Sequence, residues 1–270
     1  MPYLFFITAL FASLTSYAED LRLVSIDGAI TEIIYELGSE KNLVAVDSTS
    51  LRPHAATELP NVGYMRALSA EGVLSVQPSD IITTQGAGPK EAIEQLKQAG
   101  VNVHVIHQPY TTEGIKNTIK QVGEVLDKQA QAKALTMQLN KDLAPLKQKI
   151  ANSQAGQSAL FFLGMQGNQL MAAGMHTQAD ALLNIAKLKN ANANSHGYKP
   201  LSKEAVLSIN PDIIVIASNP SAATTGLKEQ FAYSKAFANN KILVASTDEL
   251  LGFGPRFPQA LEKVLEVAYP

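Results

Sequence analysis

The sequence has 270 residues and a formal net charge of -2, with 46% hydrophobic and 17% charged residues. These values are typical of a globular protein with enough apolar material for two hydrophobic cores, and they argue against a mainly disordered chain. The small net charge and the absence of any Lys/Arg run exclude the broad electrostatic attraction that nucleic-acid and anionic-lipid binding require.

The chain opens with an apolar segment, Pro2 to Ala18, which has no charged side chain and ends in Ser-Tyr-Ala. Small residues at these two positions are typical of a signal-peptidase site, so we expect a signal peptide over 1–18, cleavage before Glu19 and a periplasmic location. An uncleaved anchor is the alternative, although the segment is short for a membrane span. Because the sequence has no cysteine, it offers neither disulfides nor a thiol for a lipid anchor, which favours a soluble exported protein.

Strands and helices alternate through the first half of the mature chain. Short apolar runs predict strands at 21–26, 43–46, 80–84 and 101–106. Helices are predicted between them, through 31–37, at 69–76 and at 90–99, and the first and third of these end at a glycine. This βα order predicts a parallel sheet.

A long helix is predicted next, because Gln121 to Ile150 is rich in Lys, Gln, Ala, Leu and Glu and has no proline before Pro145. A helix of about 20 to 30 residues spans about 30 to 45 Å and could join two lobes as a stiff strut. A Gly/Ser-rich linker would instead allow a large hinge closure. The second half repeats the alternation, with strands predicted at 158–163, 212–217 and 241–245, and helices at 177–187, 202–209, 224–237 and from Pro255.

A repeated phrase divides the chain into two similar units. Residues 68–82 (LSAEGVLSVQPSDII) recur at 201–214 (LSKEAVLSINPDII), one residue shorter, and a Gly-Tyr pair precedes each copy, ending at Tyr64 and at Tyr198. The predicted fold is therefore α/β, with two Rossmann-like lobes that each contain a mainly parallel sheet. We expect an N-terminal lobe over 19–120, a linker helix over 121–153, a C-terminal lobe over 154–270, and a ligand cleft between the lobes.

Tyr64 lies in the loop before the first repeated helix, where its side chain would project into the cleft. A phenol oxygen can bind ferric iron, and tyrosine is one of the few residues used as an axial ligand of haem iron. A neighbouring cation favours the charged form of a phenol, and Arg66 is two residues away. The alternative is that the Tyr64 ring only packs in its loop.

Other candidate ligand contacts lie in the second half. Phe253 and Arg256 belong to a glycine- and proline-rich loop that opens the last helix, where Arg256 offers a planar fork for a carboxylate. His176 directly precedes the helix at 177–187, and Met165 lies at the end of the strand that begins at 158, a position that lines the ligand crevice of α/β folds. The alternatives are that Arg256 is solvated, that His176 lies in a surface loop, and that Met165 only provides apolar lining.

The chain resembles the periplasmic haemin-binding proteins of bacterial ABC transporters, within a larger group that binds haem, cobalamin and ferric siderophores. The resemblance covers essentially the whole mature chain. Its most specific parts are residues 63–72, 172–174, Thr177, 179–181, 197–202 and 252–256.

This resemblance implies a carrier that takes haem b as its transported ligand, with Tyr64 as axial ligand of the iron and Arg66 and Arg256 close to the ligand or its propionates. Tyr198 and Phe253 are further expected contacts. The resemblance also implies that Glu71 and Glu204, which hold the same place in both repeats, meet arginines of an inner-membrane permease whose ATPase drives import. We expect a monomer that binds no nucleic acid.

The chain departs from its relatives at Gly164-Met165, where some relatives supply a histidine and some of those hold two stacked haems. Because that histidine is absent, we expect one five-coordinate haem on Tyr64, with Met165 or His176 as contacts from the far side.

Two other functions are alternatives to haem transport. A carrier of a ferric siderophore or a cobalamin-like corrinoid is the alternative within the binding class, although the sequence has only four arginines for anionic groups. A hydrolase would have to use His176, or His104 with His107, together with Asp27 or Asp180. The sequence contains no nucleophile elbow, nucleotide-binding glycine loop or metal triad, so we expect no enzyme activity and no zinc site.

Overall fold

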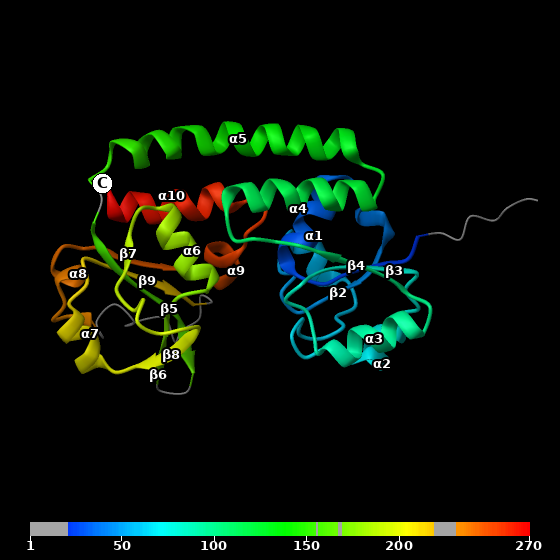
Figure 1. Ribbon diagram of the computed structural model, residues 1–270, viewed down its shortest axis with the longest axis horizontal. Coiled ribbons are helices and arrows are strands. Elements are labelled where there is room, and N and C mark those ends of the chain that lie inside the picture. The colour runs from blue at the N-terminus through cyan, green and yellow to red at the C-terminus, as the bar shows by residue number, and fades with distance from the viewer. Residues whose placement is uncertain (1–20, 155, 167–168, 219–230) are drawn as a thin grey trace, which may run out of the picture.

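The computed structural model describes residues 21–270 except 155, 167–168 and 219–230 (Figure 1). The predicted signal peptide and residues 224–230 of the helix predicted at 224–237 therefore lie outside the described residues. The same is true of the side chains of Met165, Gln166 and Gln169.

The N-lobe, which we define as β1–β4 with α1–α4, contains a sheet of four parallel strands in the order β2-β1-β3-β4. Its elements are β1 (Leu23–Ser25), α1 (Gly28–Glu36), β2 (Leu43–Val46), α2 (Ala70–Leu74), β3 (Asp80–Thr84), α3 (Lys90–Gln98), β4 (Asn102–Ile106) and α4 (Thr112–Val125), with short 3-10 helices at Glu40–Asn42 and His54–Glu58. The predicted parallel sheet is confirmed, and every predicted strand of this lobe lies within two residues of its observed bounds.

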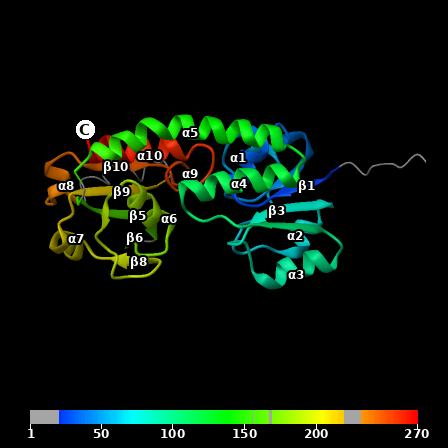
Figure 2. The ribbon, with the colours of Figure 1, turned by 45° about the horizontal axis from the view of Figure 1, so that its top comes forward.

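The single helix predicted over 121–150 is wrong in its extent, because the chain reverses between two helices there. The first helix, α4, ends at Val125, and α5 (Gln129–Asn152) begins after three connecting residues, of which Asp127 adopts a left-handed conformation with φ 53°. Gly123 allows the two helices to touch, since a Cβ at that position would lie 2.5 Å from the Cβ of Ala132. With 24 residues, α5 is about 36 Å long and runs across both lobes in Figures 1 and 2.

The C-lobe, which we define as β5–β10 with α6–α10, contains a mixed sheet in the order β10-β9-β5-β6-β8, with β7 paired to β5. Its elements are β5 (Ser158–Gln166), β6 (Gln169–Ala173), α6 (Gln178–Ile185), β7 (Lys189–Asn190), β8 (Tyr198–Leu201), α7 (Lys203–Ile209), β9 (Ile213–Ala217), α8 (Lys235–Ala238), β10 (Ile242–Ala245), α9 (Thr247–Leu251) and α10 (Phe257–Ala268). Strands β10, β9 and β5 are parallel to one another, whereas β6 is antiparallel to both of its neighbours, β5 and β8. The sequence does not predict β6, β7, β8 or α9.

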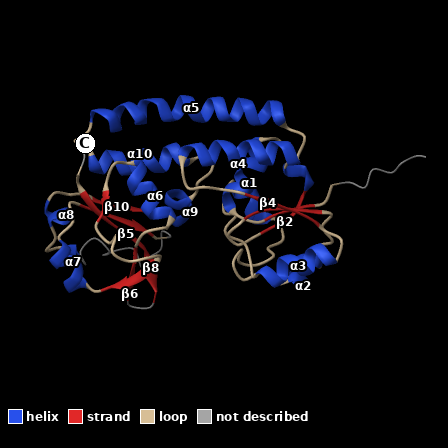
Figure 3. Ribbon diagram, in the orientation of Figure 1, coloured by secondary structure: helices blue, strands red, loops and turns tan. Residues whose placement is uncertain are grey.

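Three hydrophobic clusters organise the described residues. One cluster lies on one face of the N-lobe sheet, and another lies on one face of the C-lobe sheet. The third is continuous from the N-lobe to the C-lobe beneath α5, and it includes Ile33 of α1, Leu143 of α5 and Phe257 of α10. Figure 3 shows α5, α4 and α10 as a layer of helices above the two sheets. The lobes therefore share buried apolar surface, which resists a large change in their relative orientation.

Across the described ranges, no helix is both long enough and apolar enough to cross a membrane.

Candidate ligand-binding site

The loop that carries Tyr64 is held on the N-lobe by its neighbours. Gly63 has φ 100°, a conformation that favours glycine. Met65 is buried in the N-lobe cluster, whereas the Tyr64 side chain is 48% exposed. The Tyr64 carbonyl accepts a hydrogen bond from the Ala67 amide at 2.8 Å, which closes the turn. The structure thus presents the phenol to its surroundings instead of packing it into its own lobe.

Arg66 is exposed, and its charge acts on groups of both lobes. Burial raises the pKa of Tyr110 in the N-lobe, and the Arg66 guanidinium opposes that rise. Burial likewise raises the pKa of Tyr198 in the C-lobe to about 12, again with Arg66 acting in the opposite direction. The cation therefore lies where the two lobes face each other, two residues from Tyr64.

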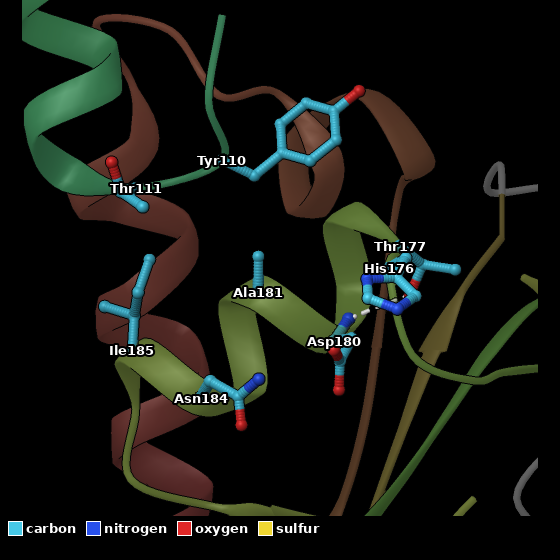
Figure 4. A pocket seen from close by; sticks show the side chains of 8 residues that line it. All are labelled: Tyr110, Thr111, His176, Thr177, Asp180, Ala181, Asn184 and Ile185. Carbon is cyan, nitrogen blue, oxygen red and sulfur yellow. Dashed lines mark hydrogen bonds between the residues drawn. The ribbon is translucent and has the colours of Figure 1, made fainter. Parts of the chain in front are cut away.

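A cavity of about 570 Å³ lies between the lobes (Figure 4). Tyr110 and Thr111, from the connection between β4 and α4, form its N-lobe side. The C-lobe side is built by His176, Thr177 and residues of α6 that include Asp180 and Asn184. This volume lies within the range of about 300 to 1,000 Å³ that is usual for small-molecule sites. Of the residues predicted to contact the ligand, His176 lines this cavity.

Tyr198 lies beside the cavity at the start of β8. Its hydroxyl is buried near Thr177, at the beginning of α6, and makes no well-formed hydrogen bond to any described residue. Because the pKa is raised to about 12, the phenol is neutral at physiological pH. Tyr198 therefore differs from its repeat counterpart Tyr64, which is half exposed.

Arg256 does not offer the free fork that the sequence suggests. Its Nη2 donates to Glu32 Oε1 of α1 at 2.6 Å and lies 3.9 Å from Asp248 Oδ2 of α9. Asp248 in turn accepts a hydrogen bond from Arg52 Nε at 3.1 Å. These four side chains connect the two lobes. The guanidinium of Arg256 is thus engaged by carboxylates of the protein, and its expected contact with a ligand carboxylate stays a prediction.

Phe253 also lies in the contact between the lobes. Its side chain is 1% exposed, and its ring centroid is 5.2 Å from that of Tyr110 and 4.8 Å from that of Phe257. The Phe253 carbonyl accepts a buried hydrogen bond from Gln108 Nε2 of the N-lobe at 3.1 Å. Phe253 therefore packs between the lobes in this structure, and its expected contact with a ligand stays a prediction.

Met165 belongs to the carboxyl end of β5, but its side chain lies outside what the structure describes. His176, by contrast, is exposed at the mouth of the cavity. Among the described residues, no group of three or more His, Asp and Glu side chains gathers as a metal site would require.

Asp27, at the carboxyl end of β1, is a strained and largely buried carboxylate. Its backbone has φ 103°, and its carboxylate accepts hydrogen bonds from Ala29 N at 2.9 Å and Thr84 Oγ1 at 3.0 Å. Burial raises its pKa from 3.8 to about 6; those two hydrogen bonds and Arg66 oppose the rise, and the nearby Asp47 adds to it. Asp27 thus holds a proton far more readily than an exposed aspartate.

Replacing Asp27 by asparagine should change how stability depends on pH. Because the folded-state pKa is raised, the stabilisation from protonated Asp27 is complete below about pH 4 and is lost as pH rises through about 6. Asparagine is neutral throughout, so relative to the wild type the variant should gain on the order of 2 to 3 kcal/mol in unfolding free energy between pH 4 and pH 7. Denaturant unfolding at several pH values measures this, with exposed Asp142→Asn of α5 as control. A stability difference that stays constant with pH would contradict the expectation.

Several residues of the site are not predicted from the sequence. Tyr110 and Thr111 follow β4 at the carboxyl end of a parallel strand, where ligands usually bind, and that position was the available signal. Glu32, Asp248 and Gln108 carry no local signal, because their importance depends on partners far away in the sequence.

Glu71 and Glu204 occupy equivalent exposed positions, each in the first turn of a short helix, α2 in the N-lobe and α7 in the C-lobe. A serine caps each helix one residue before its start, Ser69 and Ser202. Hydrogen bonds from its own amide and from Ser202 lower the pKa of Glu204, so this carboxylate is charged at neutral pH. The repeat therefore presents one exposed carboxylate on each lobe.

Residues 23–244 match the family model described as periplasmic binding protein. A periplasmic haem-binding protein from Pseudomonas aeruginosa is 35% identical in sequence, and its structure covers 92% of both chains with a TM-score of 0.80. The haem-binding protein BhuT, solved with two haems, is 32% identical over 91% of this chain and 98% of that one, with a TM-score of 0.82. The vitamin B12-binding protein of Photorhabdus laumondii is 28% identical over 93% of this chain and 88% of its own length.

Proposed function

The chain belongs to the periplasmic binding protein family, and we propose that it captures ferric haem between its two lobes and delivers it to an inner-membrane ABC transporter. More generally, it is a substrate-binding protein of the haem, cobalamin and siderophore type and not an enzyme. Its structural similarity to haem-binding proteins that share about a third of its residues supports haem as the ligand.

The observation that carries this proposal is the half-exposed phenol of Tyr64 beside Arg66, whose charge acts on both lobes. The Tyr64 oxygen would be the axial ligand of the iron in this proposal, with the exposed guanidinium of Arg66 two residues away. The interlobe cavity then takes the apolar faces of the porphyrin.

The arginines support haem over a polyanionic ligand. Arg52 and Arg256 pair with carboxylates, and Arg22 donates to the carbonyls of Val76 and Gln77. Arg66 makes no hydrogen bond or ion pair with the described part of the chain. It is therefore the arginine that can bind a haem propionate, whereas a ferric siderophore with several anionic groups would require more free cations.

Delivery follows from the two exposed carboxylates. Glu71 and Glu204 would each pair with an arginine of the permease, one from each lobe, so the docked carrier would place its ligand between them. The proposal also includes export through a cleaved signal peptide, haem b as the transported ligand, and a monomeric carrier. The three parts of the chain would be an N-terminal lobe over 19–120, a linker over 121–153 and a C-terminal lobe over 154–270.

A corrinoid is the second candidate, because the similarity to a vitamin B12-binding protein extends over 93% of this chain. Titration of the purified apo-protein separates the two ligands. Haemin should produce a Soret band that saturates at one equivalent, and calorimetry should show binding of cyanocobalamin or a ferric catecholate at least about 100-fold weaker, about 3 kcal/mol. Tighter binding of cyanocobalamin would reject the haem proposal. A break at two equivalents would reject the single-haem stoichiometry.

A further inference from the structure

Asp47, directly after β2, is a buried carboxylate of the N-lobe, with 1% of the residue exposed. Its Oδ1 accepts hydrogen bonds from the Asp27 amide at 3.0 Å and from Ser50 Oγ at 2.8 Å. Its Oδ2 accepts from the Thr49 amide at 3.0 Å and from Thr49 Oγ1 at 2.8 Å. In the described part of the chain no cation forms an ion pair with it. Since a buried carboxylate must be satisfied, these four hydrogen bonds stabilise it and in return fix the turn at 47–50.

Buried hydroxyl groups attach this turn to the sheet and to α1. Ser50 Oγ lies 2.6 Å from Thr31 Oγ1 of α1, which lies 2.7 Å from Ser25 Oγ of β1, and all three residues are buried. The Gly28 amide donates to Thr49 Oγ1 at 3.1 Å. Gly28 permits this approach, because a Cβ there would lie 2.5 Å from the Thr49 carbonyl oxygen. The turn is therefore fixed to the interior of the N-lobe.

The same turn carries the segment that leads into Tyr64. Three backbone hydrogen bonds of 2.9 Å join residues 60–63 to residues 46–48, from Val46 N to Pro60 O, from Val62 N to Val46 O, and from Ser48 N to Gly63 O. The last of these ends one residue before Tyr64. Beyond Tyr64, the Met65 carbonyl accepts a hydrogen bond from the Gly88 amide at 2.9 Å. Because the Tyr64 side chain is 48% exposed, the direction of its phenol depends mainly on this backbone.

We infer that Asp47 is a positioning residue for the Tyr64 phenol. The inference rests on the proposed function, in which that phenol binds the haem iron. The Asp47 carboxylate holds the turn at 47–50, the Ser48 amide holds the Gly63 carbonyl, and Gly63 sets the direction in which the chain enters Tyr64. Asp47 then contributes to haem affinity only through Tyr64, which distinguishes it from a residue that stabilises the fold alone.

The decisive variant is Asp47→Asn. In either orientation of the new amide, its NH2 group would face a backbone amide that also donates, that of Thr49 or that of Asp27, so half of the network is lost. We expect haemin affinity to fall about 10-fold and the charge-transfer bands of the iron–phenolate complex to shift. In a Tyr64→Phe background the same change should alter haemin affinity less than about twofold, because no phenol remains to be positioned.

Asp80→Asn is the matched control. It removes a carboxylate from the opposite edge of the same sheet, where β3 begins and Asp80 Oδ1 lies 2.9 Å from His104 Nε2. This variant should lose stability but bind haemin like the wild type, with an unchanged spectrum. Ser50→Ala is a milder second variant, since it removes one of the four hydrogen bonds to Asp47. It should lower haemin affinity about threefold, again only when Tyr64 is present.

The outcomes separate this inference from the proposed function. If Asp47→Asn, folded by circular dichroism, binds haemin with wild-type affinity and spectrum, the inference is overturned. Equal losses with and without Tyr64→Phe would also overturn it, because Asp47 would then act on the fold and not through the phenol. If Asp47→Asn does not fold, wild-type binding by Ser50→Ala has the same consequence. The proposed function fails separately, if the wild type binds no haemin or if Tyr64→Phe alone binds it with wild-type affinity.

Discussion

Replacing Tyr64 by phenylalanine should lower the affinity for ferric haem by at least about 100-fold, a loss of about 3 kcal/mol. The change removes one oxygen and keeps the ring, so the loop set by Gly63 and the buried Met65 should be unaffected. The interlobe cavity would still bind the porphyrin, which leaves a residual weak affinity. Haemin titration measures both the loss of affinity and the residual affinity. The visible spectrum of the loaded protein reports on the ligand, since loss of a phenolate also changes the charge-transfer bands of the iron.

The matched control is Tyr233→Phe, which removes the same atom from a tyrosine that is 91% exposed. This control should bind haemin like the wild type, because its hydroxyl is directed to solvent. If Tyr64→Phe kept wild-type affinity and an unchanged spectrum, the iron ligand would have to be sought elsewhere and the transport proposal would lose its chemical basis. Equal losses in the two variants would indicate a general effect on folding.

Replacing Glu32 by glutamine should destabilise the protein by about 2 kcal/mol while leaving haem affinity within about threefold. The Glu32 and Arg256 side chains are 11% and 30% exposed, and removal of one partner of such a pair leaves the other charge poorly solvated. Burial raises the pKa of Glu32 even though the hydrogen bond from Arg256 opposes that rise. The cost of the variant therefore comes from the unpaired guanidinium, which Asp248 at 3.9 Å only partly compensates.

A double-mutant cycle separates the pair from its surroundings. Arg256→Met alone should cost less than Glu32→Gln, because Glu32 can take up a proton, and the double variant should cost less than the sum of the single changes. Arg52→Met is the control, since Arg52 is 52% exposed in its pair with Asp248 and should contribute less than about 1 kcal/mol. Denaturant unfolding provides the free energies, and a Glu32→Gln loss no larger than that of Arg52→Met would contradict the expectation.

The haem affinity of Arg256→Met tests the placement of this arginine. With Arg256 engaged by Glu32, its removal should change haemin affinity little, whereas a propionate-binding arginine would lose about 10-fold or more. We therefore propose that Arg66 is the arginine that binds a propionate, whereas the family resemblance gives this role to both arginines. The ion pairs then hold the two lobes together beneath α5, next to the buried ring of Phe253. They involve Arg256, Glu32, Arg52 and Asp248.

Features that are encoded locally follow from the amino-acid sequence alone. The apolar runs of β1–β4, the glycines that end helices and the serines that cap α2 and α7 each act within a few residues, so the alternation of strands and helices could be predicted. The repeated phrase likewise identified α2 with β3, and α7 with β9, as equivalent units of two lobes. Tyr64 could be selected because its loop directly precedes one of these units.

Features that depend on partners distant in the sequence become visible in the folded chain. The composition of residues 121–150 favours a helix throughout, and the reversal at Asp127 exists because α4 packs back on α5 through Gly123. Strands β6 and β8 are defined by antiparallel pairing next to β5. The pairing of Arg256 with Glu32 and the stacking of His176 on His196 arise in the same way. Propensity and capping act over a few residues, whereas burial, ion pairing and ring stacking depend on which segments the folded chain brings together.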